Sequence, residues 1–110
     1  MADTGPPHLL TGEDFSTPSL QGLMTEEEAQ FHCFAEGFPK PSVTWLKEGI
    51  QLHDGDLDGT VTLNNRGNGL DLQIHSVEMQ HAGNYTCWAR NKLGNTSHHI
   101  LVLVTRKIYF

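Results

Sequence analysis

The chain has 110 residues, of which 37% are apolar, and a formal net charge of −6. This length and apolar content suit one domain with a single core. Its seven basic residues are scattered among thirteen acidic ones, which excludes nucleic acid as a partner, because such binding needs clustered Lys and Arg to displace counterions. No run of 18 apolar residues occurs, so we expect no membrane insertion by this segment.

Short strands separated by turn residues are predicted along the chain, with no sustained helical periodicity. Residues 1–18 form a loosely patterned N-terminal segment, the region of a first strand, and among the first twenty-odd residues only 20–23 look able to pair. Alternating apolar side chains or turn-bounded runs predict strands at 29–35, 43–46, 50–52, 60–63, 70–74, 85–90 and 96–105. Residues 53–59 read as a polar acidic loop. We therefore expect a domain over 19–105, with 106–110 as a linker or tail.

The two cysteines, Cys33 and Cys87, leave two possibilities open. In an oxidising compartment they would form one disulfide, worth about 4 kcal/mol on the chain-entropy estimate, whereas in the cytosol they would be two buried thiols. Residues 1–7 lack the basic start and apolar run of a signal peptide. An extracellular domain would therefore be a piece of a larger chain, while a native Met1 would indicate a cytosolic protein.

A family resemblance rests on spacing. Cys33, Trp45, Leu72 and the run Gly83-Asn84-Tyr85-Thr86-Cys87 resemble the immunoglobulin superfamily. The runs at 37–41, 45–49 and 89–94 resemble its intermediate, or I-set, subclass. The resemblance covers residues 24–105 and implies an all-β, two-sheet Greek-key sandwich, with strands A, B, E and D packed against A′, G, F and C and a short C′.

The resemblance also implies roles for its hallmark residues. Cys33 and Cys87 would join the two sheets, and the Trp45 indole would pack on the bridge. Leu72 would lie in the core. The Tyr85 hydroxyl would bond to backbone near the preceding turn. These roles are structural, and none of them implies catalysis.

One position departs from the family pattern. The family usually has Asp where this chain has His81, and the Arg that pairs with it aligns with Asp58. We therefore expect either an Asp58–His81 pair that raises the pKa of His81, or two exposed side chains that do not interact.

The strongest functional pattern is a set of side chains that alternation places outward. If Tyr85, Cys87 and Ala89 point inward, Trp88 and Arg90 point outward from strand F. By the same reasoning, Leu46 of strand C and Leu101 and Leu103 of strand G share that face. An exposed indole beside aliphatic residues and an Arg predicts a protein interface on the C–F–G sheet; the alternative is ordinary scattered surface residues.

Three weaker patterns are present. The triplets beginning at Asn84 and Asn95 are N-glycosylation sequons. Asp54, Asp56 and Asp58 match the first half of a calcium loop, but the twelfth position is Asn65 where a bidentate Glu is needed, so a solvated acidic loop is the favoured interpretation. Among the seven histidines, His32 and His75 could face each other across two strands, although two ligands make a poor zinc site.

The sequence contains no catalytic motif such as G-x-S-x-G or H-E-x-x-H, and no cofactor is expected. We predict a non-enzymatic interaction module. It would be an extracellular adhesion or receptor domain that binds a protein partner, a second copy of itself or neighbouring immunoglobulin domains. The alternative is an intracellular sarcomeric module similar to those of titin, which acts as a spacer or docking unit. A third class, a calcium-dependent adhesion loop, would depend on Asp56.

Overall fold

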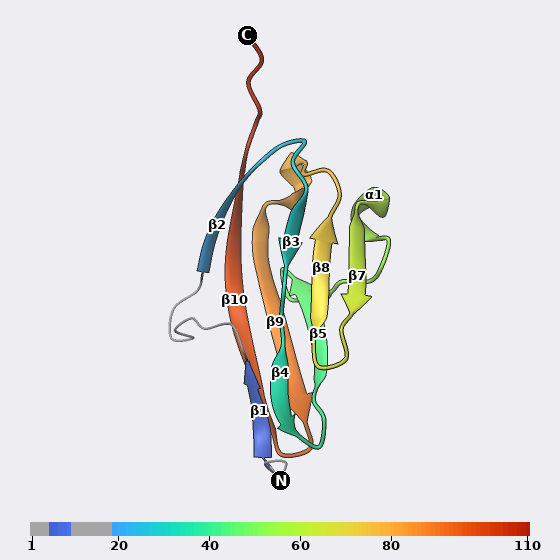
Figure 1. Cartoon of the computed structure of the whole chain (residues 1–110). Coiled ribbons are helices and arrows are strands. Elements are labelled where there is room, and N and C mark those ends of the chain that lie inside the picture. Colours follow the sequence, from blue (N-terminus) through green and yellow to red (C-terminus); the bar gives the residue numbers. More distant parts are fainter. Residues whose placement is uncertain (1–4, 10–18) are drawn as a thin grey trace.

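The computed structural model describes residues 5–9 and 19–110 and is built almost entirely of β-strands (Figure 1). In chain order the elements are β1 (Gly5–Leu9), β2 (Ser19–Met24), β3 (Ala29–Phe31), β4 (Ala35–Phe38), β5 (Ser42–Lys47), β6 (Ile50–Gln51), α1 (Asp56–Gly59), β7 (Val61–Asn65), β8 (Leu70–Ile74), η1 (Met79–His81), β9 (Gly83–Asn91) and β10 (Gly94–Thr105).

Two layers pack face to face. One layer is a five-stranded sheet in the order β2-β10-β9-β5-β6, in which β2 runs parallel to β10 and the other pairs are antiparallel. The other layer holds β3-β8-β7 and the pair β1-β4, and β4 continues the line of β3 in Figure 1. This arrangement confirms the predicted immunoglobulin-like sandwich.

The N-terminal strand β1 lies within the segment 1–18, which the sequence predicted as the region of a first strand although only residues 20–23 looked able to pair. β1 pairs with β4 and turns Pro7 and Leu9 inward. Prolines are tolerated here because β1 lies at the margin of its sheet, where some backbone N–H groups make no hydrogen bond to a neighbouring strand. The remaining residues of the predicted segment 1–18 lie outside the described residues.

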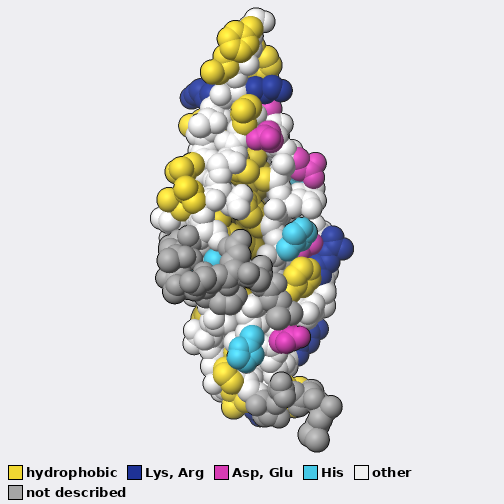
Figure 2. Space-filling model, turned by 60° about the vertical axis from the view of Figure 1, so that its left-hand side comes forward, with side chains coloured by type: hydrophobic (Ala, Val, Ile, Leu, Met, Phe, Trp, Pro, Cys, Tyr) yellow, Lys and Arg dark blue, Asp and Glu magenta, His cyan; other side chains and the backbone are white. Residues whose placement is uncertain are grey.

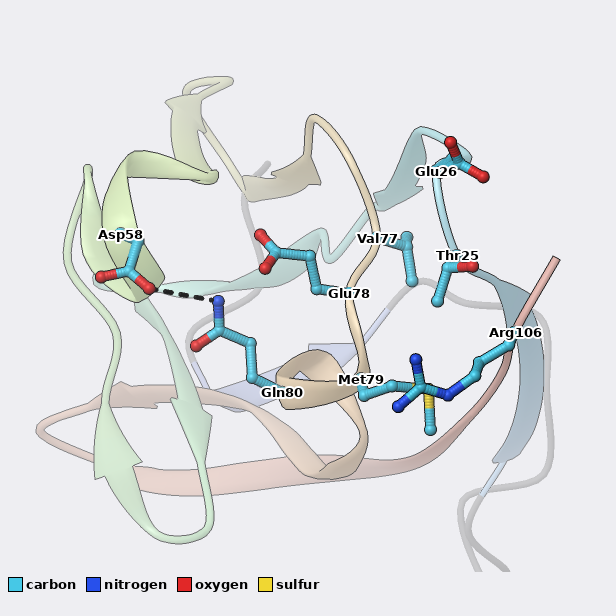
Figure 3. Close-up of a pocket in the computed structure, with 8 residues that line it drawn as sticks. All are labelled: Thr25, Glu26, Asp58, Val77, Glu78, Met79, Gln80 and Arg106. Atoms are coloured by element: carbon cyan, nitrogen blue, oxygen red, sulfur yellow. Dashed lines mark hydrogen bonds between the residues drawn. The ribbon is translucent and has the colours of Figure 1, made fainter.

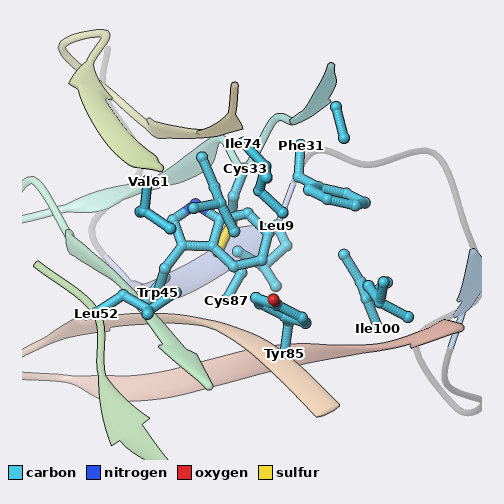
Figure 4. Close-up of a cluster of buried hydrophobic side chains, with 14 of the residues drawn as sticks. Leu9, Phe31, Cys33, Trp45, Leu52, Val61, Ile74, Tyr85, Cys87 and Ile100 are labelled. Carbon is cyan, nitrogen blue, oxygen red and sulfur yellow. A yellow bond between two sulfur atoms is a disulfide. The ribbon is translucent and has the colours of Figure 1, made fainter. Parts of the chain in front are cut away.

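The core lies between the layers, centred on Trp45 and the disulfide between Cys33 and Cys87 (Figure 4). The indole is 1% exposed, and its Nε1–H donates to the carbonyl oxygen of Leu70 at 2.7 Å. Leu72 is fully buried. Tyr85 stacks near Phe31, and its hydroxyl donates to the carbonyl oxygen of His81 at 2.6 Å. These contacts leave the outer faces and the loops available for other molecules.

Close backbone approach explains one glycine. A Cβ on Gly69 would overlap the carbonyl oxygen of Cys33 and the ring of Phe34. The contact arises where an isolated bridge joins Phe34 to Gly69, between β3 and β4. Only glycine therefore fits beside the disulfide at this point.

Candidate protein-binding face

The outward side chains of β5, β9 and β10, here called the C–F–G face, form rows across the sheet. Antiparallel Cα partners share a face, and the register places Thr44 and Ser97 on either side of Trp88. The next row holds Leu46, Thr86 and His99. All five residues predicted for the interface lie on this face: Leu46, Trp88, Arg90, Leu101 and Leu103.

Trp88 and Arg90 form one unit on β9. The guanidinium carbon of Arg90 lies 4.7 Å from the centroid of the Trp88 ring, within cation–π range. Trp88 is half-buried and Arg90 is exposed. The contact sets the positive charge of Arg90 against the indole while Arg90 itself stays exposed.

The predicted patch is not continuous. Between Trp88 and Leu101 runs the pair Thr86–His99, in which Thr86 Oγ1 and His99 Nδ1 are 2.9 Å apart. The face therefore carries two apolar groups separated by a polar row. Trp88 lies on one side of this pair and Leu101 and Leu103 lie on the other, while Leu46 stands at the end of the Thr86–His99 row itself.

A leucine that the sequence analysis did not assign to the face extends the second group. Leu20 of β2 is the parallel partner of Leu101 and is 63% exposed, while Leu101 and Leu103 are 36% and 49% exposed. Figure 2 brings the β2 side forward and shows hydrophobic side chains on this side of the molecule. Only the pairing of β2 with β10, which connects distant parts of the chain, brings Leu20 to this group.

Both sequon asparagines also lie on this sheet. Asn84 is the Cα partner of Leu101, and Asn95 is the partner of Arg90. Both side chains are exposed. Because partners share a face, Asn84 and Asn95 project on the same side as Trp88.

The acidic loop uses two of its carboxylates to hold its own backbone. Asp54 Oδ1 accepts the N–H of Leu63 at 3.0 Å, and Asp56 Oδ2 accepts the N–H of His53 at 2.8 Å. Asp58 accepts instead from Gln80 Nε2 at 3.4 Å. Over residues 5–9 and 19–110, no three His, Cys, Asp or Glu side chains come together as a metal site. Residues 56–59 form the short element α1, in which Leu57 and Asp58 take left-handed φ angles of 55° and 60°.

The predicted Asp58–His81 pair is wrong. His81 is buried, its Nδ1 accepts the N–H of Glu78 at 2.8 Å, and its Nε2 lies 2.7 Å from Thr60 Oγ1. The Thr60 hydroxyl donates to the carbonyl oxygen of Leu57, so it can only accept from the imidazole. His81 is thus a neutral Nε2–H tautomer, and burial lowers its pKa from the ordinary value of 6.5, the opposite of the predicted direction.

The outer face of the other sheet is polar and internally bonded. His32 does not meet His75, as the sequence had suggested, because each contacts another side chain: His32 Nδ1 lies 2.8 Å from Asp71 Oδ1, and His75 Nε2 lies beside Thr62 Oγ1. Arg66 Nε donates to Asp71 Oδ2 at 2.7 Å. Asp71 is 5% exposed. Burial opposes its ionisation, but the hydrogen bonds from His32 and Arg66 outweigh that effect and hold its pKa below 3.8.

A polar groove of about 550 Å³ lies where the chain leaves the domain (Figure 3). Glu26, Asp58 and Arg106 are among the residues that line it. The C-terminal residues run away from the body in Figure 1, and the N–H of Lys107 donates to Thr25 Oγ1 at 2.9 Å. The Tyr109 hydroxyl donates to a Glu26 carboxylate oxygen. The groove therefore adjoins the start of the segment predicted to be a linker or tail.

Comparison with known proteins gives relatives of several kinds. The chain is 37% identical over 87 residues to the basement membrane-specific heparan sulfate proteoglycan core protein of Mus musculus, covering 78% of this chain and 2% of that protein. It is 38% identical over 100 residues to the neural cell adhesion molecule L1-like protein of Homo sapiens, covering 90% and 8%. The chain thus spans less than a tenth of the length of these relatives.

The fold is similar to that in the crystal structure of the Titin M10–Obscurin like 1 Ig complex, with a TM-score of 0.76 and 27% identity, covering 94% of this chain and 98% of that chain. No helix in the described part of the chain is long and apolar enough to cross a membrane. The family model of the Immunoglobulin I-set domain matches residues 15–104. The chain belongs to the immunoglobulin I-set family.

Proposed function

We propose that this chain is a non-catalytic protein-binding domain of a cell-adhesion molecule or receptor ectodomain, and that it binds through the C–F–G face. One observation carries the proposal, the contrast between the two outer faces. The outward positions of β3, β8 and β7 are polar, namely Gln30, Asp71, Gln73, Thr62 and Asn64. The other sheet turns an indole and several leucines outward.

The chemistry of Trp88 and Arg90 suits the centre of an interface. Trp and Arg dominate the binding energy of measured protein interfaces because each offers a large, planar surface together with hydrogen-bond donors. The leucines on β2 and β10 would supply further apolar area. Removal of such surface from water contributes about 25 cal/mol per Å², although association entropy offsets a large part of that gain.

Self-association is the form of binding that can be tested with the chain alone. We expect Trp88→Ala to weaken it about 30-fold or more, because loss of a central tryptophan costs roughly 2 kcal/mol or more. Sedimentation velocity over a concentration series measures the effect, and Leu101→Ser tests the second apolar group. Gln30→Ala, on the polar face, is the matched control and should change nothing. Equal association of Trp88→Ala and Gln30→Ala, with both variants folded, would remove this face as the interface.

The second candidate function is an intracellular spacer or docking unit, and the likeness to a titin immunoglobulin complex favours it. The two functions differ in the state of Cys33 and Cys87, because structural disulfides persist in oxidising compartments and are rare in the cytosol. The disulfide between them supports the extracellular proposal. A count of free thiols on protein from its native source separates the two: none supports secretion, whereas two support the intracellular role.

Three further assignments belong to the proposal. Asn84 and Asn95 would be acceptors of N-linked glycan in a secreted protein, and binding through the C–F–G face would belong to chains in which they are unmodified. Residues 106–110 would connect the domain to a neighbouring immunoglobulin domain, a second kind of partner. No cofactor or metal takes part.

A further inference from the structure

The two sequons and the proposed interface occupy the same surface. Asn84 faces Leu101 across the β9–β10 ladder, and Asn95 faces Arg90. Directly paired side chains have Cβ atoms about 5 Å apart. A sugar on Asn84 would therefore lie against Leu101, and a sugar on Asn95 would lie against the Trp88–Arg90 unit.

The two asparagines are also free to react at this surface. Both are exposed, and within the described residues neither side-chain amide takes part in a hydrogen bond. The backbone of Asn84 is fixed instead, because its N–H donates to Glu48 Oε1 and its carbonyl oxygen accepts the N–H of Glu48, both at 2.8 Å. This anchoring directs the Asn84 side chain outward, on the same side as Thr86, the third residue of its sequon.

Spacing determines how much of the face two glycans would cover. Asn84 and Arg90 lie six positions apart on β9, which corresponds to about 20 Å at the rise of a strand. Glycans would thus stand at both ends of the face, with Trp88 and Thr86 between them. A stable interface needs about 800 Å² on each partner, and a flat partner cannot reach that area between two bulky sugars.

We infer that N-glycosylation of Asn84 and Asn95 closes the C–F–G face to protein partners and that the unmodified chain presents it. This inference rests on the proposed function, since the glycans would regulate access to the same face. The transfer forms a bond from the anomeric carbon of the first sugar to Nδ2 of Asn and breaks the bond from that carbon to its pyrophosphate oxygen. The amide loses one proton, and a lipid-linked pyrophosphate oligosaccharide is the co-reactant.

The test uses the chain secreted from a eukaryotic host behind a cleavable leader, beside the Asn84→Gln/Asn95→Gln double variant. Intact-mass spectrometry counts the sugars. Acrylamide quenching of fluorescence, measured on protein dilute enough to be monomeric, then reports the exposure of Trp88, because Trp45 is buried and contributes little quenching. Sedimentation velocity reports self-association of both forms.

We expect glycan on both asparagines, at least a two-fold smaller quenching constant than in the double variant, and self-association at least ten-fold weaker. Trimming the wild type to one N-acetylglucosamine per site should restore part of both signals. Absence of sugar on either asparagine, or equal quenching of the two forms, overturns the inference. Reduced quenching by the sugar, with no self-association in either form, supports coverage of the face and instead refutes self-association as its function.

Discussion

Replacing His81 tests the buried hydrogen-bond chain that runs from Glu78 through the imidazole to Thr60. His81→Phe keeps a ring of similar size but leaves the N–H of Glu78 without its acceptor and Thr60 Oγ1 without its donor. Each unsatisfied buried polar group costs about 1–3 kcal/mol. With two such groups, we therefore expect the variant to lose about 2–6 kcal/mol of unfolding free energy at pH 7.5, measured by urea denaturation.

The pH dependence of this loss gives a sharper test. Burial lowers the pKa of His81 in the folded state below the ordinary 6.5. Above that pH the imidazole is therefore neutral in both the folded and the unfolded chain, and its full contribution to stability is present. As the pH falls from 6.5 towards the folded pKa, the unfolded chain binds one proton more than the folded chain. The wild type then loses about 1.4 kcal/mol per pH unit from this group. His81→Phe lacks that loss, so the two stabilities should converge.

The control and the refutation use the same measurements. His53→Gln removes an exposed histidine of the neighbouring loop, and at pH 7.5 its stability should stay within about 0.5 kcal/mol of that of the wild type. A difference between the wild type and His81→Phe that stays constant or widens from pH 7 to pH 5 would refute the neutral tautomer. So would an NMR titration that places the pKa of His81 at or above 6.5, a measurement that does not require the variant to fold.

Two other substitutions should lower stability in distinct ways. Asp71→Asn should cost about 1–3 kcal/mol at pH 7 because it weakens the charge-assisted bonds to His32 and Arg66. Since the folded pKa of Asp71 is lowered, the wild type keeps this advantage above pH 3.8 and loses it as the pH falls through the folded pKa. Urea denaturation of both proteins at pH 7 and pH 2.5 would measure the change. An equal gap at both pH values would contradict this account. Gly69→Ala should cost about 2–3 kcal/mol, because its Cβ would overlap the Cys33 carbonyl oxygen. The control Gly22→Ala places its Cβ in open space and should stay within about 0.5 kcal/mol of the wild type in the same assay. Similar values for the two glycine variants would show that the backbone relaxes freely at Gly69.

Local patterns predicted the features that depend on neighbours in the chain. The spacing of Cys33, Trp45 and Cys87 indicated the family and its sandwich, and strict alternation along residues 85–90 indicated which side chains face outward. Both signals are short-range, since a strand reverses its side-chain direction at every residue.

Features that depend on pairing between segments far apart in the sequence were either not predicted or predicted wrongly. Leu20 joins Leu101 only through a parallel ladder between segments about 80 residues apart. Asp71 lies on the outward side of β8, where alternation predicts exposure, yet His32 and Arg66 cover it. His81 was assigned a charged partner from the family pattern, whereas the fold buries it beside Thr60, and no sequence signal distinguishes these two environments.

The two outer faces differ in how many of their polar side chains already hydrogen-bond to one another, and this difference affects where a partner can bind. On the β3-β8-β7 face, polar side chains bond to one another, as Gln73 Nε2 does with Glu28 at 2.6 Å and Asp71 does with Arg66. A partner docking there would have to break such bonds or leave them buried, and either route costs free energy. The C–F–G face exposes apolar area that gains from being covered. The same face carries both sequon asparagines, so a hydrophilic glycan and a protein partner are alternative ways of covering it, and the occupancy of the two sequons would determine which one does.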